Sequence, residues 1–157
     1  DGNTLEENAM KKARFARNSS DSDIWVMADD TGLFISALNG EPGVQAAYWG
    51  GEEKTTEERM MYALERLKGI EDRSATFKTI VAMISPEAQE YIFEGICEGT
   101  LLENPRVAPQ PKMPYSSLFV PDGHERAWAE MTVEEENSIS HRGKAFRQVK
   151  EFLSKQI

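Results

Sequence analysis

A long alternating segment at the centre of the chain limits what it can fold into. Residues 74–84 alternate between apolar and polar side chains over most of their length, which is typical of a strand. The turn signal Ser85-Pro86-Glu87 follows, and residues 90–97 return with a similar alternation. The pattern therefore predicts a long antiparallel hairpin.

Helical segments stand on both sides of this hairpin in the sequence. Three Thr–Glu pairs, each spaced three residues apart, are typical of capping boxes: Thr4 with Glu7, Thr55 with Glu58, and Thr132 with Glu135. A fourth helix is predicted from about residue 142 to 153 by the spacing of its apolar residues. Because helices and strands interleave, we expect an α/β or α+β protein with a mixed sheet.

Two further segments shape this expectation. An apolar run at residues 24–28, the turn signal Asp29-Asp30-Thr31-Gly32 and a second run at residues 33–38 predict a strand, a turn bearing carboxylates, and another strand. Residues 103–117 contain four prolines and cannot form one regular element.

Length and charge limit the class of protein. A chain of 157 residues is enough for one domain, or for two lobes that share one core. Acidic residues outnumber basic ones by 27 to 18, and the net charge of −9 disfavours unaided binding to a nucleic acid backbone. A protein with this charge can still bind an anionic small molecule if a divalent cation lies between the ligand and the protein carboxylates.

The sequence also bears on location. Cys97 is the only cysteine, so no intrachain disulfide can form, and its alternating surroundings favour a buried strand thiol over a reactive one. No apolar stretch is long enough to span a membrane. We therefore expect a cytoplasmic protein. The sequence opens on Asp1-Gly2-Asn3 without an initiating Met, and we expect the natural protein to begin upstream.

Three places could carry chemistry. Asp29 and Asp30 follow an apolar run and are suited to Mg²⁺ binding or general-base work, although both could instead cap a turn. Successive strand residues point to opposite sides, so only one of the two can easily face a given site. Glu7 could be a metal ligand or simply a capping-box residue.

The third place is Ser140-His141-Arg142, at the expected start of the last helix. Ser140 is a natural N-cap. His141 and Arg142 could bind an anion or the edge of a base there, or they could form a solvated helix start. The sequence contains no Walker loop, nucleophile elbow, zinc spacing or dinucleotide fingerprint.

Several short motifs stand in a specific order along the chain. They are Glu7-Asn8-Ala9 with Lys12-Ala13, Ala28-Asp29-Asp30-Thr31-Gly32-Leu33, Ala37-Leu38-Asn39-Gly40-Glu41-Pro42-Gly43-Val44, Arg73 with Ala75 and Phe77, Gly95 with Gly99, and Ser140-His141-Arg142 with Ala145. Together they resemble the inosine triphosphate pyrophosphatase family, whose members act on non-standard purine nucleoside triphosphates.

The resemblance implies one domain over residues 1–157, an elongated α/β fold with two lobes around a long mixed sheet and flanking helices. It implies hydrolysis of ITP, dITP or XTP to the monophosphate and pyrophosphate, with Mg²⁺ and a homodimer. Carried over by position, Asp30 is the general base, and the metal-binding carboxylates are Glu7, Asp29 and Asp30. The resemblance also implies these substrate-binding residues: Thr31, Gly32, Tyr115, Ser140, His141 and Arg142.

The chain also departs from the family pattern. The family's glycine-rich aromatic loop aligns with residues 112–119, where Tyr115 and Phe119 remain but Met113 replaces an aromatic residue. Glu136 stands in place of a phosphate-binding lysine. Two interpretations therefore stay open: a divergent pyrophosphatase with altered specificity, or a catalytically weak or inactive nucleotide-binding or interaction protein on the same fold.

Overall fold

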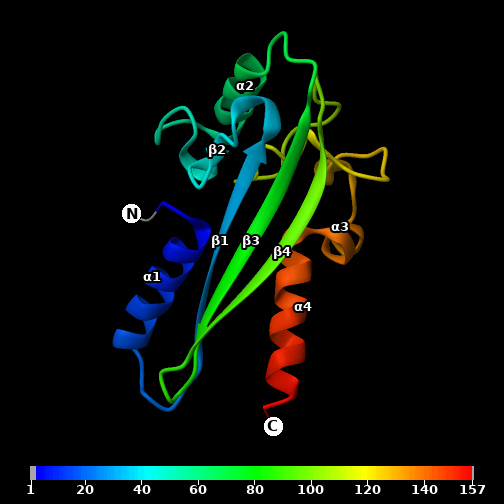
Figure 1. Ribbon diagram of the computed structural model, residues 1–157. Helices are drawn as coiled ribbons and strands as arrows, with labels where there is room; N and C mark the ends of the chain where they lie inside the picture. The colour runs from blue at the N-terminus through cyan, green and yellow to red at the C-terminus, as the bar shows by residue number, and fades with distance from the viewer. Residues whose placement is uncertain (1–2, 157) are drawn as a thin grey trace.

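A long antiparallel sheet runs through an elongated molecule (Figure 1). The computed structural model describes residues 3–156, so Asp1, Gly2 and Ile157 lie outside the described residues. The strands are β1 (Val26–Ile35), β2 (Pro42–Gly43), β3 (Ser74–Ile84), β4 (Glu90–Leu101) and β5 (Phe119–Pro121). The α-helices are α1 (Leu5–Asn18), α2 (Thr56–Arg66), α3 (Val133–Ile139) and α4 (His141–Ser154).

The predicted hairpin is confirmed as β3 and β4, which pair in register from Ser74↔Thr100 to Ile84↔Glu90. The strand order is β2-β1-β3-β4-β5. Every pairing between the described strands is antiparallel, in place of the mixed arrangement expected from the sequence. The reason is that each connection leaves and re-enters the sheet at the same end, whereas a parallel pair needs a crossover.

The strand–turn–strand prediction for residues 24–38 is wrong. Residues Val26–Ile35 form one continuous strand, and Asp29-Asp30-Thr31-Gly32 lie in its middle. Asp29 pairs in register with Val81, and Asp30 with Ile80. Ladder hydrogen bonds to β3 along the whole strand outweigh the local turn preference of these residues. The carboxylates are therefore held on a rigid strand rather than on a hairpin turn.

The two long helices cover opposite faces of the sheet (Figure 1). Leu5, Ala9 and Ala13 of α1 pack with Ile80 and Ala82. On the other face, α4 packs through Ala145 and Val149 against Val81 and Met83. Strand residues of one parity therefore face α1, and residues of the other parity face α4.

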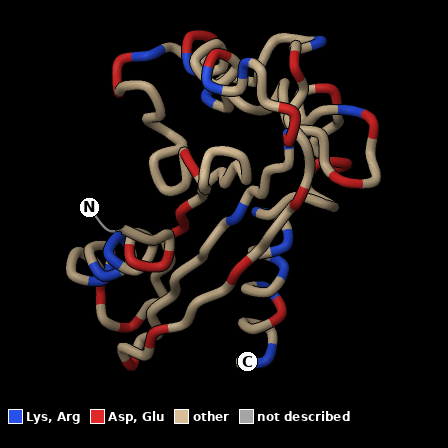
Figure 2. Tube along the Cα trace, turned by 45° about the horizontal axis from the view of Figure 1, so that its top comes forward, with Lys and Arg blue, Asp and Glu red and all other residues tan. Residues whose placement is uncertain are grey.

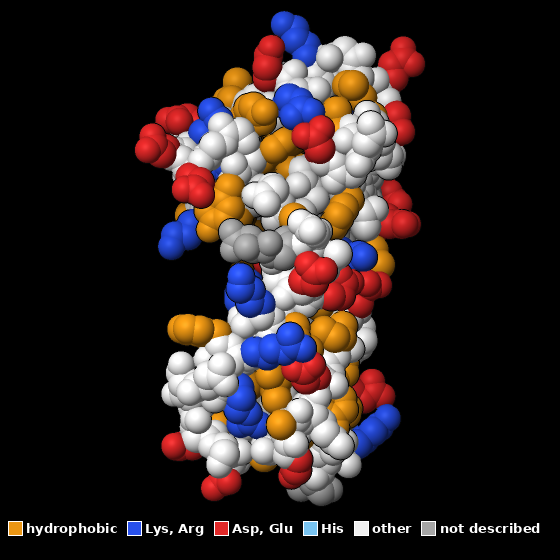
Figure 3. Space-filling model, turned by 60° about the vertical axis from the view of Figure 1, so that its left-hand side comes forward, with side chains coloured by type: hydrophobic (Ala, Val, Ile, Leu, Met, Phe, Trp, Pro, Cys, Tyr) orange, Lys and Arg blue, Asp and Glu red, His pale blue; other side chains and the backbone are white. Residues whose placement is uncertain are grey.

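A third and larger cluster fills the end of the sheet that α1 and α4 leave uncovered. It gathers α2, residues 103–131 and the α4-side face of the strands, with Leu33, Leu67, Phe119 and Trp128 at its centre. Residues 103–117 hold no helix or regular strand, as their prolines predict. The molecule narrows between its two ends (Figure 3). No helix among residues 3–156 has the length and apolarity to cross a membrane.

Acidic and basic residues are interspersed along the trace (Figure 2). Cys97 is buried, as the sequence predicts, and burial raises the pKa of its thiol to about 11. A thiol with that pKa stays protonated at neutral pH and is a poor nucleophile.

Candidate functional site

Asp29 and Asp30 point to opposite faces of the sheet, and each meets a cation from the helix on its own side. Lys12 of α1 lies 3.2 Å from Asp30 Oδ1. Arg142 of α4 lies 3.3 Å from Asp29 Oδ2. Lys12 Nζ also donates a hydrogen bond to the carbonyl of Asp29. The pair of carboxylates is therefore fixed from both sides.

One carboxylate oxygen of Asp30 makes no hydrogen bond with the described residues. Its Oδ2 is buried and has no hydrogen-bond partner among the described residues, while Oδ1 contacts Lys12. An unpartnered buried carboxylate oxygen is costly for a fold and is expected at a site where a ligand, cation or water completes it. Asp30 is thus the strongest candidate for a reactive or ligand-binding group on the α1 side.

Glu7 lies at the start of α1 and is exposed. Its amide donates to Thr4 Oγ1 at 3.1 Å, and its carboxylate accepts from the amide of Asn3 at 2.8 Å. The Thr4 half of the predicted capping box is therefore present, while the Glu7 carboxylate binds the amide of Asn3 in place of that of Thr4. No group of three or more His, Cys, Asp or Glu side chains placed to hold a metal occurs within residues 3–156. Glu7, Asp29 and Asp30 do not form one such group.

Thr31 and Gly32 continue the strand beyond the two carboxylates. Thr31 Oγ1 lies 2.7 Å from Thr79 Oγ1. A Cβ added to Gly32 would lie 2.8 Å from the carbonyl oxygen of Gly43, so this position needs glycine for the close approach of the 40–43 loop. These residues hold the middle of β1 against its neighbours.

Ser140, His141 and Arg142 start α4, as predicted. Ser140 is the N-cap, and its Oγ accepts from the amide of Gly143 at 3.0 Å. The His141 ring stacks on Phe77, with 4.8 Å between ring centroids and an interplanar angle of 13°. Its Nδ1 is buried and has no hydrogen-bond partner among the described residues. Burial first, and then the nearby Arg142 and Lys144 charges, lower the pKa of His141 to about 4.

Arg142 is more exposed than its neighbour. Its guanidinium lies 5.3 Å from the centre of the Phe146 ring, one turn along the helix, and also contacts Asp29. The side chain is 60% exposed, so most of its donors face solvent. A neutral imidazole beside a guanidinium with free donors can recognise a planar ligand with carbonyl oxygens at its edge.

Tyr115 lies in the core rather than on an open surface. Its side chain is buried, and its hydroxyl donates to the carbonyl of Ala46 at 2.5 Å. Burial raises the pKa of this phenol well above its usual value, only partly offset by Arg59. Met113, two residues earlier, is exposed. Tyr115 therefore ties the 103–117 segment to the 46–48 turn.

Glu136, at the position of the family's lysine, lies in the middle of α3 and is partly buried. Burial raises the pKa of its carboxyl, and a hydrogen bond with the Gln110 side chain opposes this shift. Gln110 also has a buried side-chain oxygen without a partner among the described residues. The 103–117 segment and α3 therefore meet through two polar side chains, one of which is incompletely satisfied.

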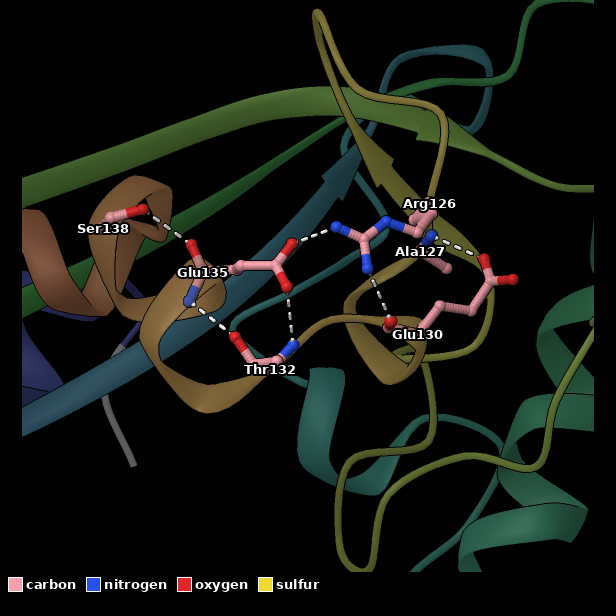
Figure 4. A network of polar contacts seen from close by, with 6 residues as sticks. All are labelled: Arg126, Ala127, Glu130, Thr132, Glu135 and Ser138. Carbon is pink, nitrogen blue, oxygen red and sulfur yellow. Dashed lines mark hydrogen bonds and ion pairs between the residues drawn. The ribbon is translucent and has the colours of Figure 1, made fainter.

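A polar network fixes the start of α3 (Figure 4). Thr132 Oγ1 accepts from the amide of Glu135 at 3.1 Å, and the amide of Thr132 donates to Glu135 Oε1 at 3.4 Å, which confirms this capping box. Arg126 forms an ion pair with Glu135 and donates to the carbonyl of Glu130. Because α3 leads directly into Ser140, the network also positions the start of α4.

Sequence reasoning assigned no role of their own to three residues at this site. Lys12 entered only as a motif residue, and its contact with Asp30 depends on how α1 packs on β1. Phe77 likewise entered only as a motif residue, yet its ring stacks against the His141 ring. Gln110 lies in the proline-rich segment, where no periodicity exists to indicate which way a side chain points.

Comparisons with the sequences and structures of known proteins show the family of this chain. The sequence profile of the Ham1 family matches residues 1–152. The chain belongs to the Ham1 family. The resemblance to the inosine triphosphate pyrophosphatases, found in the sequence motifs, is thereby confirmed, and the α/β architecture agrees with solved Ham1 structures.

Relatives and structures cover nearly the whole chain. A dITP/XTP pyrophosphatase of Christiangramia forsetii is 44% identical over 98% of this chain and 78% of its own length. One from Caldanaerobacter subterraneus is also 44% identical, over 99% of this chain and 77% of its own. The Staphylococcus aureus Ham1 protein superposes with a TM-score of 0.89 at 31% identity, covering 99% of this chain and 79% of that one.

Proposed function

We propose that this Ham1-family chain hydrolyses dITP, XTP and ITP to the nucleoside monophosphate and pyrophosphate. Relatives named dITP/XTP pyrophosphatase, 44% identical over nearly the full chain, support this enzyme class. The observation that carries the proposal is Asp30, whose Oδ2 is buried without a partner among the described residues, in the middle of β1. A carboxylate oxygen of this kind suits the activation of a water molecule.

In the proposed reaction, Asp30 orients a water molecule and accepts its proton. The water oxygen bonds to the α-phosphorus, the bond between that phosphorus and the bridging oxygen breaks, and pyrophosphate leaves. Lys12, already bound to Asp30 Oδ1, keeps the carboxylate in place and adds positive charge near the phosphates. Positioning and charge compensation carry most of the catalysis in phosphoryl chemistry of this type.

The residues on the α1 side fit a divalent cation such as Mg²⁺. Asp30 offers an unpartnered oxygen, and Glu7 adds an exposed carboxylate. Mg²⁺ commonly takes one or two protein carboxylates and completes its shell with water and substrate phosphates, so no larger protein cluster is needed. When bound, the cation offsets the negative charge of the triphosphate. Asp29, which the resemblance implies as a third ligand, points to the other face and pairs with Arg142, so we do not assign it to this cation.

We assign base recognition to the start of α4. Arg142 has free donors that can face the 6-oxo group of a purine, and neutral His141 presents an adjacent ring edge. Thr31 and Gly32 are proposed to lie along the substrate, with Ser140 fixing the helix start. Tyr115 is proposed to support the pocket wall from the core, in keeping with its burial.

The test is pyrophosphate release from dITP, XTP, ITP, dATP and dGTP in the presence of Mg²⁺. Wild-type protein, Asp30→Asn and the control Glu94→Gln are compared; Glu94 forms an exposed ion pair with Lys78 on β3. We expect release from the 6-oxo substrates to fall at least about 100-fold in Asp30→Asn and to stay unchanged in the control. Equal release by Asp30→Asn and wild type, or none by folded wild-type protein, would overturn the proposal.

One observation favours a second candidate, a nucleotide-binding protein with weak or no turnover. Glu136 places a partly buried carboxylate where the family pattern has a phosphate-binding lysine. Binding of dITP by calorimetry without pyrophosphate release would support this candidate.

A homodimer and a cytoplasmic location stay predictions. Light scattering of the purified protein tests the first, and imaging of a tagged chain in its host tests the second.

A further inference from the structure

We infer that Asp29 is a positioning residue for base recognition, because it holds the Arg142 guanidinium in place across the α4 face of the sheet. The inference rests on the proposed function and names how its base specificity is set. The two neighbouring carboxylates then have different roles. Asp30 serves the phosphate end of the substrate, and Asp29 serves the base end through Arg142.

The Asp29 side chain points toward α4. Asp29 pairs in register with Val81, and Val81 packs with Ala145 and Val149 of α4. Residues opposite each other in an antiparallel pair share a face. Asp29 therefore faces α4, and its Oδ2 meets Arg142 Nη1 at 3.3 Å.

Both partners of this contact are held in place. The Asp29 side chain is 27% exposed, and its backbone is fixed by the ladder to β3 and by the Lys12 hydrogen bond to its carbonyl. On the helix side, the Phe146 ring lies against the Arg142 guanidinium. An exposed ion pair alone has little effect, but a pair with one partner on a fixed strand loses less side-chain freedom when it forms.

The contact leaves most of the Arg142 donors free. Arg142 uses Nη1 toward Asp29, and a guanidinium carries five N–H donors in a planar fork. The remaining donors can therefore address a carbonyl oxygen while the ion pair with Asp29 keeps the guanidinium at this position. Without Asp29, the 60% exposed side chain would sample many rotamers, and recognition of the 6-oxo group would weaken.

The experiment compares two substrates that differ only at the recognised group: dITP, and purine 2′-deoxyriboside triphosphate, which lacks the 6-oxo oxygen. For Asp29→Asn we expect kcat/KM with dITP to fall about fivefold, mainly through KM, and to stay within about twofold with the analogue. Arg142→Ala should lose the same discrimination, and the double variant should lose no more than Arg142→Ala alone.

The outcomes separate the alternatives. An equal loss on both substrates, together with a higher Mg²⁺ concentration for half-maximal activity, would overturn the inference and make Asp29 a metal ligand. Unchanged discrimination in Asp29→Asn would also overturn it. Thermal melting of each variant checks folding, and Glu94→Gln serves as the ion-pair control. If wild-type protein releases no pyrophosphate, the proposed function fails, and the same comparison by calorimetric binding still decides the role of Asp29.

Discussion

Gly95 sets the distance between α4 and the sheet, and an added methyl group at this position provides a sharp test. Gly95 lies on β4 on the face that α4 covers. A Cβ built there would lie 1.9 Å from the carbonyl oxygen of His141 and 2.6 Å from the amide nitrogen of Ala145. Both are backbone atoms, so no side chain can rotate away to make room.

The geometry gives the size of the effect. The first turn of α4 must move by roughly 1.5 Å to restore an ordinary contact, against the hydrogen bonds from Lys144 to the Ile96 carbonyl and from Gln148 to the Glu94 carbonyl. Overpacking of this kind costs about 2 kcal/mol, which corresponds to a Tm lower by about 4–8 °C in a chain of this size. Since His141 and Arg142 lie on the displaced turn, kcat/KM with dITP should fall by up to about 100-fold.

Thermal melting by circular dichroism and pyrophosphate release from dITP measure the two effects in Gly95→Ala. The control is Glu94→Gln, one residue away on the same strand, with its side chain on the other face. We expect the control to behave like wild-type protein in both assays. A Gly95→Ala protein with a Tm within about 1 °C of wild type and unchanged kcat/KM would refute the reasoning that this contact sets the position of α4.

Three further predictions concern residues around this turn. The pKa of His141 is lowered from 6.5 to about 4 in the folded protein. Between pH 6.5 and pH 4, the imidazole is therefore protonated in the unfolded state but not in the folded state. The free energy of unfolding therefore keeps its full value above pH 6.5 and is lower by about 3 kcal/mol at pH 4. In His141→Gln this loss should disappear, so the free energy of unfolding, measured with urea, should depend less on pH between 6.5 and 4. Glu136→Lys should raise kcat/KM for dITP at least about tenfold at low ionic strength, because it removes repulsion from the triphosphate; an unchanged value would place Glu136 away from the phosphates. Thr132→Ala should lower stability by about 1 kcal/mol by removing the cap on α3, and an unchanged Tm would contradict the importance of this network.

Long periodic elements could be predicted from the sequence, and locally ambiguous ones could not. The 74–84 strand, its return and the Thr-initiated helices were all predicted because alternation and capping are local signals. The turn predicted at Asp29-Asp30-Thr31-Gly32 was wrong because its residues favour turns locally, while pairing with β3 keeps them extended. Tertiary context decided the structure of this segment.

In the candidate site, too, some features could be predicted from the sequence and others depend on tertiary contacts. Asp30 and the start of α4 followed from the order of motifs, and strand alternation correctly indicated that Asp29 and Asp30 would face different sides. The burial of Tyr115 and the contact between Gln110 and Glu136 were not predictable, because the proline-rich segment that brings them together has no repeating pattern. Ion-pair partners such as Lys12 become visible only when helix packing is known.

The continuous course of β1 explains why its two carboxylates stand side by side in the sequence. A turn at this point would leave both side chains on a mobile loop. A strand directs one toward Lys12 of α1 and the other toward Arg142 of α4, at fixed positions and on opposite faces. A slip of one residue in the pairing with β3 would exchange these faces and would also move Val26 and Ala28 away from α1. The packing of α1 against β1 therefore maintains the register that places Asp30 and Asp29 on their separate sides.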